Sequence, residues 1–301
     1  MLGQTGKPVT DTIRHMSMRI IRNSLVALVV VALTAACAPS AEVVQTPSPT
    51  PLVTTTATAT PTPEPDVFTI VVLGDSRASE KPVDCSGCTS FVQQLAVTLK
   101  GQLGEKIEVV DHTQPGTDLT ALSLALGRDD AIKEDLEAAE IVIVSVGREE
   151  GPPWEGEGCP GGPATTPREQ LAVIATYTPA CITETITIFG ERYSDLFDTI
   201  ATLSPDAESR LAMTLFNSFL GNPEYGTIDA ATTSRLVSIV TEWNKAQCDA
   251  AKPVGFTCLD VYRAINGATG RTPGGALLSP DHEHFSQAGH DALATLITRA
   301  S

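Results

Sequence analysis

Residues 67–301 alternate between short apolar runs and longer stretches in which apolar positions recur with helical spacing. Each apolar run is bounded by glycine or polar residues, which is typical of a strand buried in a parallel sheet. The predicted strands are 67–74, 106–112, 141–147, 210–217 and 255–262. The helical pattern covers 89–104, 117–126, 128–140, 168–203, 229–251 and 286–300. Strands that alternate with helices in this way predict one α/β domain, a three-layer α/β/α sandwich around a five-stranded parallel sheet.

The chain before residue 67 lacks this rhythm and has the pattern of an export segment. An apolar run at 25–33 follows Arg19 and Arg22, precedes small residues and is short for a membrane-spanning helix, so residues 1–36 predict a signal peptide. The stretch Leu-Thr-Ala-Ala-Cys that ends at Cys37 resembles the lipobox of bacterial lipoproteins. This resemblance implies that Cys37 is lipidated and anchors the exported protein to the bacterial cell membrane, facing outside the cytoplasm. A plain signal peptide cleaved near Ala36 and an uncleaved anchor are the alternatives.

Residues 37–66 predict a tether between this cysteine and the folded domain. Proline and threonine dominate 38–66, and no hydrophobic period is present there. Such a segment cannot bury a core, and its prolines favour an extended conformation. We therefore expect 37–66 to be a lipidated cysteine followed by a linker that holds the domain away from the membrane surface.

The charge of the chain excludes one class of partner. Residues 1–36 hold four Lys/Arg and one Asp/Glu, so the rest of the chain carries 16 basic and 35 acidic residues, a formal net charge of −19. A surface this acidic repels phosphate backbones, so we expect no nucleic-acid partner. We expect a monomer whose partners are substrate molecules and, through the lipid anchor alone, the membrane.

The cysteines indicate disulfides in an exported chain. With Cys37 assigned to lipid, six of the seven remain, an even number that favours a disulfide framework. Proximity in sequence suggests the pairs Cys85–Cys88, Cys159–Cys181 and Cys248–Cys258. The Cys-Ser-Gly-Cys stretch lacks thioredoxin-like surroundings and the second half of a zinc site. Because no other cluster has metal-ligand spacing and no phosphate-binding loop is present, we expect neither metal nor cofactor.

The candidate chemistry begins at Ser76, directly after the first predicted strand. A serine in this place is more often a helix N-cap than a nucleophile, because a hydroxyl needs a base and the base needs an orienting group. Asp281 and His284 supply both in an Asp-x-x-His turn before the last helix. Three residues apart, the carboxylate can bond one ring nitrogen and leave the other for Ser76. The sequence therefore favours a Ser-His-Asp triad.

The order of these motifs resembles the SGNH, or GDSL-type, hydrolase family. Gly74-Asp75-Ser76 follows the first strand, Gly116 follows the second, a Gly-x-x-x turn at Gly147 follows the third, and the Asp-x-x-His turn precedes the last helix. The resemblance covers 67–301 and implies a flavodoxin-like sandwich and ester hydrolysis. It assigns Ser76 as nucleophile, His284 as general base and Asp281 as its orienting residue. It places the backbone N–H groups of Ser76 and Gly116 in the oxyanion hole.

One position departs from the family pattern. The third oxyanion donor of the family is the asparagine of a Gly-x-Asn-Asp turn, and Glu149 stands in its place. An ionised carboxylate accepts hydrogen bonds and repels a developing oxyanion. Three alternatives are open: Glu149 is protonated by burial, Arg148 supplies the donor, or Asn217 after the fourth strand does. Loss of one donor typically lowers turnover by about 10²–10³-fold.

Two functions are compatible with these motifs. The first is a membrane-tethered serine hydrolase that cleaves acyl or acetyl esters of small molecules, glycans or lipids through an acyl-enzyme; small or sugar-borne esters are favoured because no long hydrophobic lid is evident. The alternative is a binding protein on the same fold, impaired in catalysis by Glu149, that holds a surface glycan or cell-wall ligand. Trp154 is either a substrate platform or a pin for the loop near Cys159. We expect Asp75 to brace the turn and His290 to be structural.

Overall fold

The computed structural model describes residues 67–299 apart from 155–157, 160 and 162–163. The predicted signal peptide, the lipidated Cys37 and the linker lie outside the described residues and stay predictions. Among the described residues, no single helix is long and apolar enough to cross a membrane. One sharply bent pair, α4 (Pro167–Ala175) and α5 (Pro179–Leu203), has the length and composition of a span only when the two helices are taken together.

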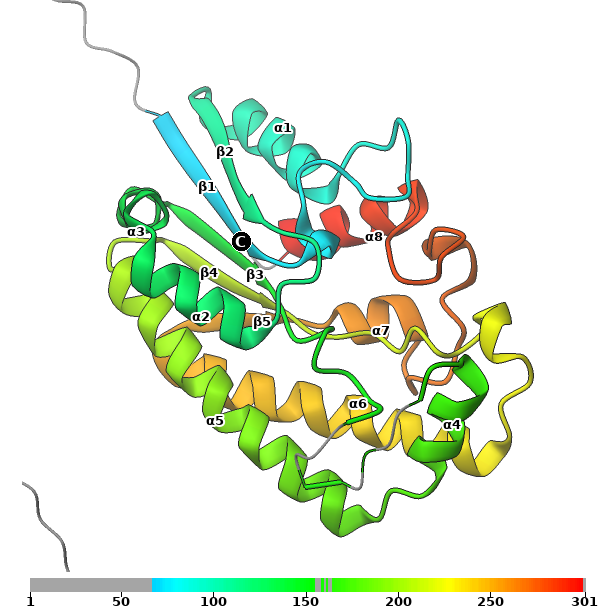
Figure 1. Cartoon of the computed structure of the whole chain (residues 1–301). Coiled ribbons are helices and arrows are strands. Elements are labelled where there is room, and N and C mark those ends of the chain that lie inside the picture. The colour runs from blue at the N-terminus through cyan, green and yellow to red at the C-terminus, as the bar shows by residue number, and fades with distance from the viewer. Residues whose placement is uncertain (1–66, 155–157, 160, 162–163, 300–301) are drawn as a thin grey trace, which may run out of the picture. The chain divides into compact units, whose positions relative to one another are not determined.

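Five parallel strands form one sheet in the described part of the chain, with the order β2-β1-β3-β4-β5. The first strand is central, and its last residue, Gly74, is in register with Thr113 of β2 and Ser145 of β3. The carboxyl ends of these three strands therefore meet at one edge of the sheet (Figure 1). The strands are β1 Val67–Gly74, β2 Lys106–Thr113, β3 Ile141–Ser145, β4 Ser209–Met213 and β5 Phe256–Leu259.

Helices cover both faces of the sheet, as the sequence predicts. Alternate residues of one strand enter two separate cores: Val71 and Leu73 of β1 join the core beneath α2, α3, α5 and α6, whereas Ile70 and Val72 join the core beneath α1, α7 and α8. Two cores on opposite faces confirm the three-layer sandwich (Figure 1). The helices are α1 Phe91–Leu103, α2 Leu119–Arg128, α3 Asp130–Glu137, α4 Pro167–Ala175, α5 Pro179–Leu203, α6 Ala230–Ala251, α7 Val261–Asn266 and α8 Gln287–Thr298.

Three strands are shorter than the sequence predicts: β3 ends at Ser145 instead of at residue 147, and β4 and β5 also end early. After Met213, the backbone N–H of Leu215 donates to the Asn244 side chain at 2.8 Å instead of to a neighbouring strand, so β4 ends early. The predicted strand 255–262 ends at Leu259 because the Asp260 side chain accepts the backbone N–H of Arg263 and starts the short helix α7. A distant side chain thus sets the end of β4, whereas a local helix cap sets the end of β5.

Three disulfides join the cysteines in the pairs that proximity suggests: Cys85–Cys88, Cys159–Cys181 and Cys248–Cys258. The third links α6 to β5, the edge strand of the sheet. The second links α5 to the loop that follows β3. The second and third disulfides therefore crosslink elements that also pack together in the core on the α5 and α6 face of the sheet.

Candidate active site

The turn after β1 presents Ser76 at the carboxyl edge of the sheet. Gly74 has a φ of +117°, and a Cβ built on it would lie 1.7 Å from the carbonyl oxygen of Ser145, so only glycine fits between the two strands. The backbone N–H of Asp75 then donates to that same oxygen at 2.8 Å. Held in this way, the chain turns into the 3₁₀ turn η1, Ser76–Ala78, whose first residue is Ser76.

Asp75, not Ser76, is the capping residue of this turn. Its carboxylate accepts the backbone N–H of Arg77 at 3.0 Å and the Arg77 guanidinium at 2.5 Å, and it accepts the Ser145 hydroxyl at 3.2 Å. Asp75 and Arg77 are both buried, and they brace the turn, as the sequence predicts for Asp75. The Ser76 hydroxyl is therefore free of a capping role.

A continuous hydrogen-bonded chain joins the three residues of the predicted triad. Ser76 Oγ lies 2.8 Å from His284 Nε2, and His284 Nδ1 lies 2.5 Å from Asp281 Oδ2. The other oxygen of Asp281 accepts the backbone N–H groups of Glu283 and His284 at 3.0 and 3.1 Å. Partial burial raises the pKa of Asp281, but these hydrogen bonds outweigh it and lower the pKa to about 2. Asp281 is therefore an anion at neutral pH and fixes the imidazole orientation.

A second carboxylate, which the sequence analysis did not single out, faces the same imidazole. Asp84 Oδ2 lies 3.6 Å from His284 Nδ1. One ligand-type atom from each of Asp84, Asp281 and His284 lies within 4.8 Å of the others, so this group could hold a metal ion. Because Nδ1 already bonds Asp281, a metal there would compete with the chain of bonds to Ser76. We assign His284 and Asp281 to that chain, and Asp84 lies beside it.

The loop after β2 carries Gly116 beside the Ser76 turn. The backbone N–H of Gln114 donates to the Gly74 carbonyl at 2.9 Å, and Thr117 N–H closes a turn onto Gln114 at 3.2 Å. Gly116 is exposed, and no atom lies within 4 Å of where its Cβ would be. Its backbone is thus accessible on a turn that is tied directly to the end of β1.

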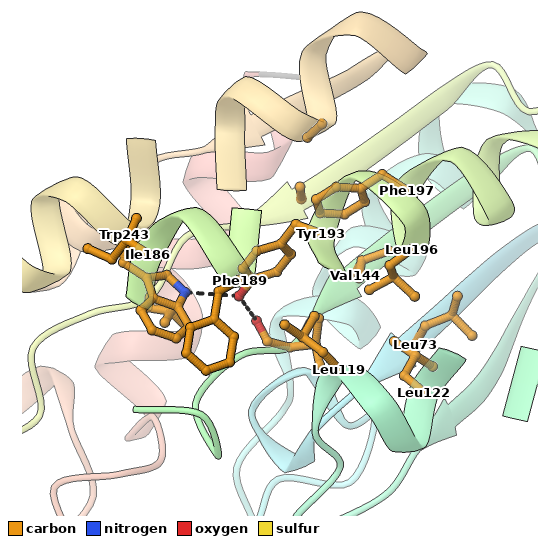
Figure 2. Close-up of a cluster of buried hydrophobic side chains, with 14 of the residues drawn as sticks. Leu73, Leu119, Leu122, Val144, Ile186, Phe189, Tyr193, Leu196, Phe197 and Trp243 are labelled. Atoms are coloured by element: carbon orange, nitrogen blue, oxygen red, sulfur yellow. Dashed lines mark hydrogen bonds between the residues drawn. The ribbon is translucent and has the colours of Figure 1, made fainter. Parts of the chain in front are cut away.

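The turn after β3 is held in place by hydrogen bonds to aromatic residues of the core. Tyr193 of α5 donates its hydroxyl to the Val146 carbonyl at 3.0 Å and accepts the Trp243 indole N–H at 3.0 Å (Figure 2). A Cβ on Gly147, whose φ is +111°, would lie 1.8 Å from the Tyr193 hydroxyl oxygen. A glycine at 147 therefore lets the end of the strand pack directly against Tyr193, and this contact sets the position of residues 148–150.

The three residues after Gly147 do not supply the oxyanion donor that the family pattern implies at this turn. Glu149 is exposed, so the alternative that requires a buried Glu149 does not hold. The Arg148 guanidinium pairs with Glu283, on the turn between Asp281 and His284. The buried carboxyl is Glu150, which accepts the backbone N–H of Leu119. Burial, together with nearby acidic charges, raises the pKa of Glu150 to about 7 even though that hydrogen bond lowers it.

Asn217, the remaining alternative donor, is buried at 1% exposure after β4. Its side-chain oxygen accepts the backbone N–H of Phe219 at 3.2 Å. Its side-chain nitrogen has no hydrogen-bond partner among the described residues. The neighbouring Phe216 contacts both Arg77, whose guanidinium lies 5.8 Å from the ring centre, and Phe285, at 5.3 Å between ring centres. Asn217 therefore follows a residue that contacts both the turn of Ser76 and the segment next to His284.

Trp154 and His290 are structural. The Trp154 ring stacks on Tyr177 at 5.3 Å and is 3% exposed, which agrees with a pin for the loop and not with a substrate platform. His290 is buried against Phe91, whose backbone N–H it accepts at 3.4 Å. Burial lowers the pKa of His290 to about 4, so this histidine is neutral at physiological pH.

A cleft of about 440 Å³ adjoins the loops after β2 and β3. Its lining includes three acidic residues, one arginine and two aromatic rings: Asp118, Glu149, Glu150, Arg192, Trp154 and Phe189. A larger cleft, about 670 Å³, lies over β5 and α6, and neither cleft is lined by a triad residue. We relate the smaller cleft to the site because Asp118 and Glu149 directly follow the two turns that flank Ser76.

Several solved structures have a similar fold, and three of them are lipases by name. The lipase Lip_vut3 from a goat rumen metagenome matches with a TM-score of 0.58 and 15% identity, over 78% of this chain and 97% of that chain. A GDSL-like lipase from Parabacteroides merdae matches with a TM-score of 0.52 and 13% identity, over 77% and 94%. An extracellular lipase from Streptomyces rimosus matches with a TM-score of 0.52 and 14% identity, over 78% and 100%. No family model and no curated protein matches the chain.

At these identities the likeness shows the fold. The chain has the fold of the GDSL-like hydrolases, which confirms the fold that the resemblance implied. No role for Asp84, Glu150 or Glu283 could be predicted from the sequence. Each contacts a residue far along the chain, so no local spacing indicates it.

Proposed function

We propose that the protein is a serine hydrolase that cleaves carboxylic esters through an acyl-enzyme. Ser76 attacks the ester carbonyl while His284 takes its proton. The protonated imidazole, held by Asp281, then delivers that proton to the departing alcohol. Water attacks the acyl-enzyme with His284 again as base, and this step releases the acid and restores the serine.

The observation that carries this proposal is the chain of bonds from Ser76 to His284 to Asp281, at 2.8 and 2.5 Å. A serine hydroxyl bonded to an imidazole whose second nitrogen faces an ionised carboxylate is an activated nucleophile. The lipase fold of the structural neighbours supports the same reaction class.

The oxyanion would be held by backbone N–H groups. We assign Ser76 and Gly116 as the donors, because the Gly116 turn is bonded to the end of β1 and its backbone is exposed. Two aligned backbone donors stabilise the negative charge that develops on the carbonyl oxygen. We assign no side chain as third donor, because the unpartnered nitrogen of Asn217 is itself buried.

The adjacent cleft favours small or sugar-borne esters over long acyl chains. Its carboxylates and arginine suit hydroxyl-rich alcohols, which bind through several polar contacts. The signal and lipobox patterns before residue 67 support an exported protein anchored at Cys37 with the hydrolase domain outside the cytoplasm. We propose that it acts there as a monomer, without a nucleic-acid partner.

A second candidate function is a binding protein on this fold. The observation that favours it is Glu149, an exposed carboxylate at the position where the family has an amide donor. Such a protein would hold a surface glycan or cell-wall fragment without turnover.

Hydrolysis of p-nitrophenyl acetate tests the proposed reaction. Purified wild-type chain should release p-nitrophenol well above the uncatalysed rate. Ser76→Ala and His284→Ala should each lose at least about 10³-fold of kcat. Ser86→Ala, which removes an exposed serine from a nearby loop, is the matched control and should keep the wild-type rate. A Ser76→Ala variant that hydrolyses the ester at the wild-type rate sinks the proposal.

A further inference from the structure

The imidazole of His284 faces one more carboxylate than the proposed reaction uses. Asp84 Oδ2 lies 3.6 Å from His284 Nδ1, the same ring nitrogen that Asp281 Oδ2 approaches to 2.5 Å. Charged N–H···O bonds are about 2.7–2.9 Å long, so Asp84 is less than about 1 Å from making one. The two carboxylates reach this nitrogen from loops about 200 residues apart along the chain, one after β1 and one before α8.

The loop that carries Asp84 is fixed at both ends next to the site. At its start, the backbone N–H of Glu80 donates to Asp111 at 2.8 Å. At its end, Thr89 N–H donates to the side chain of Gln287, on the helix that follows His284, at 2.8 Å. Both loop ends are therefore tied to segments that also border the site.

Within this loop, the backbone at Asp84 is constrained further. Asp84 has a φ of +54°, a left-handed conformation that is uncommon for residues with a side chain. The next residue, Cys85, forms the disulfide with Cys88, and Cys88 N–H closes the turn onto the Cys85 carbonyl at 3.0 Å. Uncommon backbone conformations persist where the surroundings impose them, and they cluster at functional sites.

The two carboxylates also interact with each other. A hydrogen bond to Asp281 and the charge of Asp281 raise the pKa of Asp84. The side chain of Asp84 is 59% exposed, whereas that of Asp281 is 28% exposed. Asp84 therefore remains mobile enough in its side chain to shift, while Asp281 is held by the backbone of its own turn.

We propose that Asp84 is a second positioning residue for His284, able to take over the Nδ1 hydrogen bond when Asp281 is lost. The proposal rests on the proposed function of the Ser76 site. In the intact protein, Asp281 makes this bond and Asp84 lies 3.6 Å from Nδ1. Without Asp281, a side-chain shift of less than about 1 Å lets Asp84 accept a hydrogen bond from Nδ1–H. The imidazole then keeps the tautomer that leaves Nε2 facing Ser76.

A double-mutant cycle on the full chain tests this role. We measure kcat and KM for p-nitrophenyl acetate in Asp84→Asn, Asp281→Ala and the double variant. Removing the only orienting carboxylate of a triad typically lowers kcat by about 10⁴-fold. We expect Asp84→Asn alone to lose no more than about threefold, Asp281→Ala about 10²-fold and the double variant about 10⁴-fold, with KM unchanged. Asp84→Glu in the Asp281→Ala background should keep at least tenfold more kcat than Asp84→Asn, since it retains a carboxylate.

Asp206→Asn is the matched control, since Asp206 is an exposed aspartate before β4, at the opposite edge of the sheet. Combined with Asp281→Ala, it should change kcat by less than about twofold. Circular dichroism verifies that each variant is folded, and Asp281→Ser replaces Asp281→Ala if the latter does not fold.

The inference is overturned if Asp281→Ala alone already loses about 10⁴-fold and Asp84→Asn adds nothing to it. That outcome leaves the proposed function intact. Failure of the proposed function is seen separately, as full activity in Ser76→Ala, so the two failures are distinguishable.

Discussion

Replacement of Glu150 by glutamine should make the protein more stable at alkaline pH and leave its stability at acidic pH unchanged. One carboxylate oxygen of Glu150 accepts the Leu119 N–H, and the other is buried without a hydrogen-bond partner among the described residues. Burial and the charges of Asp118 and Asp75 together raise the pKa of Glu150 to about 7, from 4.5 for an ordinary glutamate. The folded protein therefore holds this proton more tightly than the unfolded chain does.

The sign and size of the effect follow from that difference. Below pH 4.5 the carboxyl is protonated in both states, so the folded state keeps its full stability there. As the pH rises to 7, the unfolded chain releases the proton first, and the free energy of unfolding falls. A difference from 4.5 to about 7 corresponds to about 3 kcal/mol at pH 8. Glutamine stays neutral, and its carbonyl still accepts the Leu119 N–H.

Urea unfolding followed by circular dichroism at pH 4, 6 and 8 measures this effect. The advantage of Glu150→Gln over wild type should grow from near zero at pH 4 to about 3 kcal/mol at pH 8. Glu149→Gln, which neutralises the exposed neighbour, should show no such trend. A stability difference for Glu150→Gln that does not change with pH would refute the assignment of Glu150 as a buried, proton-holding carboxyl.

Three further predictions concern the surroundings of the site and the fold. Gly147→Ala places a methyl group against the Tyr193 hydroxyl and should lower the free energy of unfolding by about 3 kcal/mol or more. Gly104→Ala, also at positive φ but in open space, should lower it by about 1 kcal/mol. Thermal unfolding compares the two variants, and equal losses contradict the packing argument. Replacing both Cys248 and Cys258 by serine removes a disulfide between residues 10 positions apart and should lower the free energy of unfolding by about 3 kcal/mol. Urea titration measures the loss, and no loss would mean that the disulfide does not constrain the unfolded chain. Glu149→Asn should raise the kcat for p-nitrophenyl acetate by about 10–10³-fold if the absent amide limits turnover, and an unchanged rate would show that another donor fills the position.

The sequence predicted the sheet because its central strands are largely buried. The segments of β1 and β3 are nearly continuous apolar runs, and the helices between the strands have a clear hydrophobic period, so element type and order could be predicted. The precise strand ends could not, since Asn244 and Asp260 take over backbone groups at the ends of β4 and β5. The bond to Asn244 joins positions 29 residues apart and leaves no local pattern, whereas the Asp260 cap is a local signal that the strand prediction did not use.

The three triad residues of the candidate site were predicted from the sequence, and the carboxylates around them were not. Ser76, Asp281 and His284 lie where their motifs imply, because strand ends of a parallel sheet meet at one edge. Asp84 was not predicted, since its approach to His284 depends on the path of a loop closed by a disulfide. Glu150 was not predicted either, because burial of one of two adjacent glutamates is a property of the folded loop.

Labelling with a fluorophosphonate probe tests the central claim most directly. This reagent phosphonylates serines that a neighbouring base activates, so peptide mapping by mass spectrometry should find the label on Ser76, and Ser76→Ala should abolish it. An unlabelled yet folded protein would favour the binding function over the hydrolase. A label on another residue, or undiminished labelling of Ser76→Ala, would contradict the assignment of Ser76 as the nucleophile.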